Sequence, residues 1–191
     1  MPARARILVV TATAKELAAA DGWRTLLCGV GPVEAAAATA AEIQRERPSL
    51  ILHLGIAGAR RSAGIAPTTL VIGSETRYCD LGVAPKWAPN TLVAAPDLVA
   101  AAQRALPAAM VLPIGTSGRI GGTVGVDVEA MEGFGVLRAA QRARVPALEV
   151  RCISNEVEET DRARWHFDAA FAAVARATPL LVAELARTLG D

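Results

Sequence analysis

Short apolar runs alternate with helical segments along the whole chain. Six of these runs have the length and composition of buried strands: Ile7–Val10, Arg24–Cys28, Leu50–Leu54, Thr69–Gly73, Met110–Ile114 and Ala147–Ile153. Three longer segments between or beside them have helical patterns: Val33–Arg47, Pro96–Leu106 and Val126–Arg144. This alternation predicts an α/β fold of three layers, in which helices flank a mixed, largely parallel central sheet. We expect residues 1–191 to form one domain.

Charge and cysteine content argue against several classes of protein. Lys and Arg number 20 against 19 Asp and Glu, and the basic residues are interspersed with acids, so the sequence indicates neither a nucleic-acid partner nor a membrane partner. The three widely spaced cysteines, Cys28, Cys79 and Cys152, favour free thiols in a reducing compartment over a disulfide framework or a zinc site. With no signal-peptide pattern or run of membrane-spanning length, we expect a cytoplasmic protein.

Two acids lie near the start of the predicted helix Val126–Arg144. Glu129 and Glu132 are three residues apart, so on a helix they share one face. The helix dipole favours acids there whatever the function. Glu132 differs in following Met131 and preceding a glycine, and a carboxylate in such a setting can accept hydrogen bonds from two neighbouring hydroxyls, as a ribose diol offers. Both interpretations remain open from these residues alone.

Polar side chains also follow two of the predicted strands. Ser154 and Asn155 follow Ala147–Ile153, and Glu16 comes shortly after Ile7–Val10. Open α/β sheets build ligand sites at the carboxyl ends of strands, so these groups are candidates to meet at one site. The alternatives are that Ser154 and Asn155 cap a turn and that Glu16 is a surface acid.

Other noticeable residues have a structural explanation of comparable weight. The glycine turns at 29–31 and 55–58 lack the spacing of a dinucleotide-binding fingerprint, and by themselves they favour tight-turn packing. Arg151 lies in an otherwise apolar strand, where a buried guanidinium needs a partner such as Glu132. His53 and His166 are predicted to be packing or surface residues.

Several segments, in this order, resemble the purine nucleoside phosphorylase/nucleosidase superfamily, and within it the futalosine hydrolases. The matching segments are Leu8–Thr13 with Glu16, Gly29–Ala36, Gly55–Ala59, Asp127–Gly133 and Val150–Val157, followed by Asp161, Arg162 and Trp165. The resemblance covers nearly the whole chain. It implies a nucleoside phosphorylase-like fold, a small nucleoside as ligand, a homo-oligomer (a dimer or higher) and no metal or organic cofactor.

The resemblance also implies roles for individual residues. Glu16 matches the acid that activates the attacking water, and Met131 and Glu132 match the pair that holds the ribose. Asn155 stands where related methylthioadenosine/S-adenosylhomocysteine nucleosidases carry an Asp that protonates the purine. The further residues expected to contact substrate are Ile56, Ala57, Gly58, Arg151 and Ser154.

The amide of Asn155 bears on which purine is bound. An amide has both a donor and an acceptor, which suits the O6, N7 and N1 pattern of a 6-oxopurine better than a 6-aminopurine. We therefore expect hydrolysis of futalosine to hypoxanthine in menaquinone biosynthesis. The alternatives are a methylthioadenosine/S-adenosylhomocysteine nucleosidase, a purine nucleoside phosphorylase, and, from another class, a non-catalytic nucleoside-binding protein.

The chain departs from the family in two places. About one hairpin of strand is absent between Glu16 and Gly29, and the segment 115–125, where relatives often place an aromatic ring that stacks on the base, is compressed. Three other aromatic residues are candidates for that stacking role: Trp87, Phe134 and Trp165. Near the C-terminus, Pro179 is expected to kink or divide the last helix, with Thr178 able to cap its second half.

Overall fold

The computed structural model describes residues 2–190, and its elements follow the predicted alternation of strands and helices. The strands are β1 (Ile7–Thr11), β2 (Arg24–Leu27), β3 (Leu50–Ala59), β4 (Leu70–Tyr78), β5 (Thr91–Val93), β6 (Met110–Thr116), β7 (Val128–Ala130) and β8 (Ala147–Glu156). The helices are α1 (Pro32–Arg45), α2 (Pro96–Ala105), α3 (Gly133–Arg142) and α4 (Phe167–Thr188). Short 3-10 turns lie at Ala3–Arg6, Arg61–Ala63 and Arg162–Arg164.

The eight strands form one mixed sheet, as predicted. The parallel pairs are β1–β2, β1–β3, β3–β8, β4–β6 and β6–β7. The pairs β3–β7, β4–β8 and β4–β5 are antiparallel. Because β8 pairs with both β3 and β4, the strands β3, β7, β6, β4 and β8 close into a ring. The carboxyl ends of β1, β3 and β8 therefore lie at one edge of the molecule.

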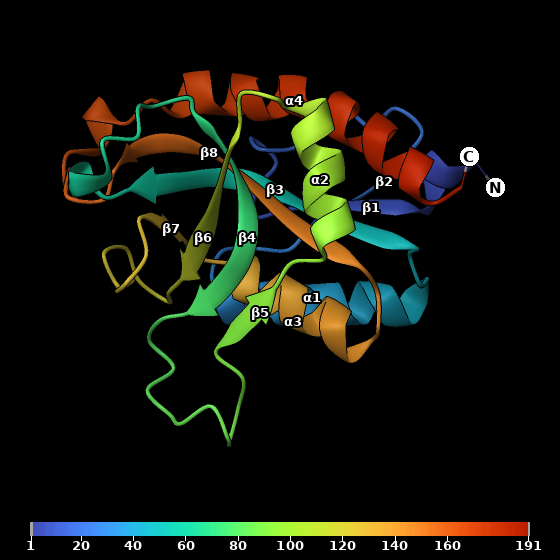
Figure 1. Ribbon diagram of the computed structural model, residues 1–191, viewed down its shortest axis with the longest axis horizontal. Coiled ribbons are helices and arrows are strands. Elements are labelled where there is room, and N and C mark those ends of the chain that lie inside the picture. The colour runs from blue at the N-terminus through green and yellow to red at the C-terminus, as the bar shows by residue number, and fades with distance from the viewer. Residues whose placement is uncertain (1, 191) are drawn as a thin grey trace.

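Helices cover both sides of the sheet (Figure 1), with α2 and α4 on one side and α1 and α3 on the other. Alternate residues of β1 separate into the two cores. Ile7 and Val9 pack with the α2 and α4 side, whereas Leu8 and Val10 pack with the α1 and α3 side. This period of two is what a strand buried on both faces requires. The three-layer prediction is confirmed.

Two predicted helices differ from the structure. The helix expected at Val126–Arg144 is shorter in the structure. Its first part forms strand β7, because Val128–Ala130 pairs with β3 and β6, and helix α3 begins only at Gly133. Glu129 and Glu132 therefore do not share a helical face. Of the kink or division expected at Pro179, the division does not occur, because α4 continues through this residue. The hydroxyl of Thr178 donates to the carbonyl of Val174, 2.8 Å away, instead of capping a new helix.

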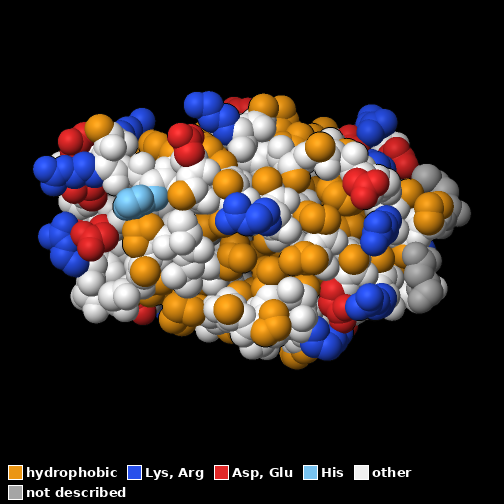
Figure 2. Space-filling model, turned by 90° about the horizontal axis from the view of Figure 1, so that it is seen from above, with side chains coloured by type: hydrophobic (Ala, Val, Ile, Leu, Met, Phe, Trp, Pro, Cys, Tyr) orange, Lys and Arg blue, Asp and Glu red, His pale blue; other side chains and the backbone are white. Residues whose placement is uncertain are grey.

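Helix α4 is long and apolar enough to cross a membrane by length and composition alone, but half of its apolar window is buried inside the fold. Its buried residues, such as Leu181 and Leu185, belong to the core beneath it. The face that α2 and α4 present to solvent carries scattered Lys, Arg, Asp and Glu among apolar side chains (Figure 2). The helix thus packs as a core helix in this structure.

Candidate functional site

A cavity of about 970 Å³ opens at the carboxyl ends of β1, β3 and β8. It brings together segments that are far apart in the sequence: the turn after β1, the end of β3, the β7–α3 junction, the end of β8 and the start of α4. The predicted site residues that line it are Glu16, Ile56, Ala57, Gly58, Met131, Glu132, Ser154 and Asn155. Ligand pockets in α/β sheets form at this position.

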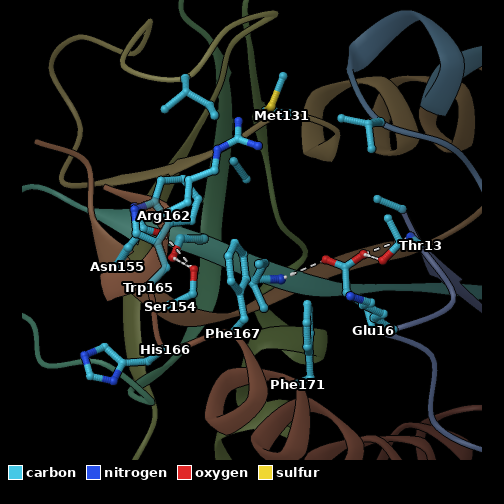
Figure 3. Close-up of a pocket in the computed structure, with 18 of the residues that line it drawn as sticks. Thr13, Glu16, Met131, Ser154, Asn155, Arg162, Trp165, His166, Phe167 and Phe171 are labelled. Carbon is cyan, nitrogen blue, oxygen red and sulfur yellow. Dashed lines mark hydrogen bonds between the residues drawn. The ribbon is translucent and has the colours of Figure 1, made fainter. Parts of the chain in front are cut away.

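Glu16 is held in place by hydrogen bonds although it is not on a helix. Its Oε2 accepts from the backbone N of Thr13 at 2.9 Å and from the Thr13 hydroxyl at 3.1 Å. Its Oε1 accepts from the backbone N of Ile56 on β3 at 3.1 Å (Figure 3). The segment after β1 is an irregular turn, which folds the carboxylate back toward the sheet. Glu16 is 5% exposed, so it meets solvent almost only through the cavity.

Glu132 occupies the N-cap position of α3 and is 5% exposed. Its Oε1 accepts a hydrogen bond from the backbone N of Gly31 at 3.2 Å, and its Oε2 lies 3.3 Å from Nη2 of Arg151. The ion pair predicted between Arg151 and Glu132 is confirmed. One backbone donor and one ion pair leave part of the acceptor capacity of the Glu132 carboxylate free to face the cavity.

Arg151 differs from the other predicted substrate contacts because it does not line the cavity. Its side chain is fully buried behind Glu132, and its Nε donates to Oε1 of Glu149 at 2.8 Å. Burial raises the pKa of Glu149 above its ordinary value, and Arg151 opposes this shift. The guanidinium acts on the cavity through the carboxylates that it holds, which the apolar strand pattern could not reveal.

Glu129 also lines the cavity, but its carboxylate is already occupied by the loop that precedes β7. Its Oε1 accepts from the backbone N of Gly121 at 2.5 Å, and its Oε2 accepts from the backbone N and hydroxyl of Thr123 at 2.9 and 2.7 Å. Glu129 therefore fixes the compressed segment 115–125, and these three bonds take most of the acceptor capacity of its carboxylate.

Ser154 and Asn155 lie near the carboxyl end of strand β8 and face the cavity from the side opposite Glu16 in Figure 3. The Ser154 hydroxyl lies 2.7 Å from Oδ1 of Asn155, and Nδ2 of Asn155 donates to the carbonyl of Glu156 at 2.8 Å. The amide is therefore fixed in orientation. It keeps one N–H and one acceptor lone pair for a ligand.

Aromatic side chains form one wall of the cavity. Trp165, Phe167 and Phe171 follow one another with ring centroids 5.3 and 5.9 Å apart, and the guanidinium of Arg162 lies 5.7 Å from the Trp165 ring. Of the three predicted stacking candidates, only Trp165 lines the cavity. Trp87 is 79% exposed in a loop, and Phe134 is buried against Tyr78.

Phe167 and Phe171 were not found by sequence reasoning. Their spacing of four residues at the start of a helix is a signal for a shared face, but it does not distinguish a cavity wall from core packing. His166, predicted as a packing or surface residue, is exposed at the N-cap of α4 and lines the cavity rim.

The cysteines are free thiols, as predicted, and stand apart from the cavity lining. Burial and the nearby Glu132 carboxylate raise the pKa of Cys28 to about 12, and burial raises the pKa of Cys152 to about 11. Both thiols therefore stay protonated and unreactive near neutral pH. Within residues 2–190, no group of three or more His, Cys, Asp or Glu side chains is arranged to hold a metal ion.

Comparison with known proteins finds relatives by sequence and by structure. A family model for the phosphorylase superfamily matches residues 21–187. The futalosine hydrolase of Streptomyces coelicolor is 36% identical, over an alignment that covers 81% of this chain and 76% of that protein.

Solved structures share the fold. The futalosine hydrolase of Helicobacter pylori strain 26695 superimposes with a TM-score of 0.82 at 15% identity, covering 93% of this chain and 97% of that one. A 5′-methylthioadenosine/S-adenosylhomocysteine nucleosidase from Colwellia psychrerythraea 34H, in complex with adenine, superimposes with a TM-score of 0.81 at 18% identity, covering 94% and 95%. At such identities the likeness establishes the architecture alone.

Proposed function

This chain belongs to the phosphorylase superfamily, and we propose that it is a nucleosidase that hydrolyses the N-ribosidic bond of a 6-oxopurine nucleoside. The proposed substrate is futalosine, the compound named in the 36% identical relative. The products are then hypoxanthine and dehypoxanthine futalosine, a step of menaquinone biosynthesis. The proposed reaction needs no cofactor.

One observation carries the proposal: two buried carboxylates, Glu16 and Glu132, face the same cavity, and each is fixed by backbone donors. Glu16 accepts three hydrogen bonds, two on Oε2 and one on Oε1. A carboxylate has about four acceptor sites, so one remains on Oε1 for a water molecule. Glu132 keeps one lone pair on each oxygen, which matches the two hydroxyls of a ribose.

The proposed mechanism uses these two acids in different roles. Glu16 orients a water molecule and takes its proton as the oxygen attacks C1′ of the ribose. Glu132 binds the 2′- and 3′-hydroxyls, and its negative charge stabilises the positive charge that develops on the ribosyl ring as the bond to the base breaks. Both carboxylates are positioned before the substrate binds, so little reorganisation is needed during the reaction.

Asn155 is the proposed reader of the base. Its remaining N–H suits N7 or O6 of hypoxanthine, and its remaining lone pair on Oδ1 suits a donor such as N1–H. Because an amide does not deliver a proton as a carboxylic acid does, the departure of the base rests on hydrogen bonding to the developing anion.

Water rather than phosphate is the proposed nucleophile. Phosphorylases that this superfamily resemblance brings into comparison carry a basic residue for phosphate in a Gly-Asp-Pro-x-Arg turn after the first strand. The corresponding turn of this chain reads Thr-Ala-Thr-Ala-Lys and ends at Lys15, so it lacks that motif. Lys15 and Arg162 are the basic residues in the lining of the described cavity. Arg162 lies over the Trp165 ring, on the wall formed by the start of α4.

A nucleoside panel tests the proposal. In phosphate-free buffer we expect hypoxanthine from futalosine, less from inosine and little adenine from methylthioadenosine. Asn155→Asp, which removes the side-chain donor, should shift the ratio of hypoxanthine to adenine release toward adenine by about tenfold, the size of one mismatched hydrogen bond. Adenine release that exceeds hypoxanthine release in the unaltered protein contradicts the role of Asn155. Tight nucleoside binding without any release supports the non-catalytic alternative.

The assembly and location are also proposals. Val30 and Ile120 line the cavity and are 56% and 45% exposed, which supports a homo-oligomer in which a neighbouring subunit closes the rim. The free cysteines support a reducing, cytoplasmic location. Size-exclusion chromatography coupled to light scattering measures the oligomeric state directly.

A further inference from the structure

His53 is a fully buried histidine on β3 that the proposed mechanism does not use. Its Nδ1 lies 3.0 Å from the carbonyl oxygen of Val10 on the neighbouring strand β1. A carbonyl oxygen only accepts hydrogen bonds, so Nδ1 must carry a proton and donate it. One edge of the ring is therefore fixed by the sheet itself.

The other edge of the His53 ring faces Arg151. Nη2 of Arg151 lies 2.5 Å from Nε2 of His53. A guanidinium only donates, so Nε2 must be unprotonated and accept. These two contacts together define a neutral ring with its proton on Nδ1. Burial and the charge of Arg151 lower the pKa of His53 well below its usual range, in agreement with this geometry.

Arg151 connects His53 to the cavity. The same Nη2 that donates to His53 lies 3.3 Å from Oε2 of Glu132, while Nε donates to Glu149 at 2.8 Å. Nη2 carries two hydrogens in the plane of the guanidinium. An acceptor for one of them, together with the bond from Nε, fixes that plane and so holds the charge of Nη2 beside Oε2 of Glu132.

We propose that His53 is a positioning residue that holds the ribose-binding carboxylate Glu132 in place through Arg151. The role of Glu132 in this inference rests on the proposed function. A neutral acceptor has a physical advantage at this position. Glu132, Glu149 and Glu16 already surround the single guanidinium, and a further carboxylate would compete with Glu132 for its charge. The imidazole orients Arg151 without neutralising it.

Two substitutions separate the two hydrogen bonds of His53. His53→Gln places an amide oxygen near the position of Nε2, so it keeps an acceptor for Arg151 and loses the bond to Val10. His53→Asn is shorter, so its amide reaches the Val10 carbonyl and leaves Arg151 without an acceptor. Both variants remove the ring and introduce an amide in the same buried site. They differ in side-chain size by one methylene group, so the readout must not depend on stability.

The readout is the preference of the protein for inosine over 2′-deoxyinosine, measured as a ratio of kcat/KM. Partial unfolding lowers both rates equally and leaves this ratio unchanged, whereas a displaced Glu132 loses its contact with the 2′-hydroxyl. We expect His53→Asn to reduce the preference about tenfold, and His53→Gln to stay much closer to the unaltered protein. Equal ratios in all three proteins overturn the proposal.

Crystal structures of the two variants test the geometry without reference to turnover. We expect the Arg151–Glu132 ion pair to persist in His53→Gln and to break or lengthen in His53→Asn. An unchanged ion pair in both variants overturns the positioning role even if the protein is an active nucleosidase. Conversely, an unaltered protein that releases no base while the variants differ as expected contradicts the proposed reaction and leaves the positioning role in place.

Discussion

Glu16 is the residue whose surroundings are most specific for chemistry. It comes from an irregular turn, yet three donors from Thr13 and Ile56 fix both of its oxygens at the cavity wall. A surface acid does not acquire such partners, because exposed carboxylates are satisfied by water. The buried position thus favours a catalytic role over the surface alternative that the sequence left open.

Replacing Glu16 by Gln tests that role. Gln has nearly the same shape but does not accept a proton, so we expect kcat for base release to fall by about 10²- to 10⁴-fold, the usual contribution of a general base. Nucleoside affinity, measured by isothermal titration calorimetry, should change little because Glu132 and Asn155 are intact. Glu16→Asp keeps the charge on a shorter side chain, so its kcat should lie between that of the unaltered protein and that of Glu16→Gln. Unchanged turnover in Glu16→Gln contradicts the assignment.

At the scale of elements, strand β3 lets two charged side chains approach across its backbone. A Cβ at Gly55 would lie 2.7 Å from Oε1 of Glu16 and in contact with the guanidinium of Arg151. The backbone of Gly55 is not in a left-handed conformation, so the demand for glycine here comes from the close approach of these groups. From the sequence alone, this glycine appeared only as part of a turn.

Gly55→Ala should therefore reduce activity by displacing Glu16 and Arg151. We expect kcat to fall at least about tenfold, and the free energy of unfolding to fall by about 1–3 kcal/mol, as for overpacking in a buried site. Gly118→Ala is a suitable control, because its added Cβ would meet only Asp80 Oδ2, at 3.6 Å. Activity assays and urea denaturation measure the two effects. Equal behaviour of the two variants contradicts the argument for Gly55.

The elements also show which parts of the fold the sequence could predict. Long apolar runs such as β1 and the start of β3 are specified by their own composition. The three residues of β7 are not, because their hydrogen bonds come from β3 and β6, which are distant in sequence. The same limit applies to the aromatic wall, since Phe167 belongs to the cavity only after α4 has packed beside β8.

At the scale of the whole molecule, the closed ring of strands brings five separate segments to one cavity. Most of the predicted site residues meet there, because the carboxyl ends of parallel strands must share an edge. Arg151 does not, and its place behind Glu132 follows from side-chain packing that local sequence patterns do not encode. In the proposed mechanism this arrangement supplies a fixed acid for water, a fixed acid for ribose and a fixed amide for the base.

Hydrolysis of futalosine by this arrangement is tested most directly by measuring the products with and without phosphate. In phosphate-free buffer we expect stoichiometric release of hypoxanthine and dehypoxanthine futalosine, at a rate that added phosphate leaves unchanged. Mass spectrometry should then detect no sugar 1-phosphate. A requirement for phosphate, with a sugar 1-phosphate as product, would contradict the assignment of Glu16 as the base that activates water.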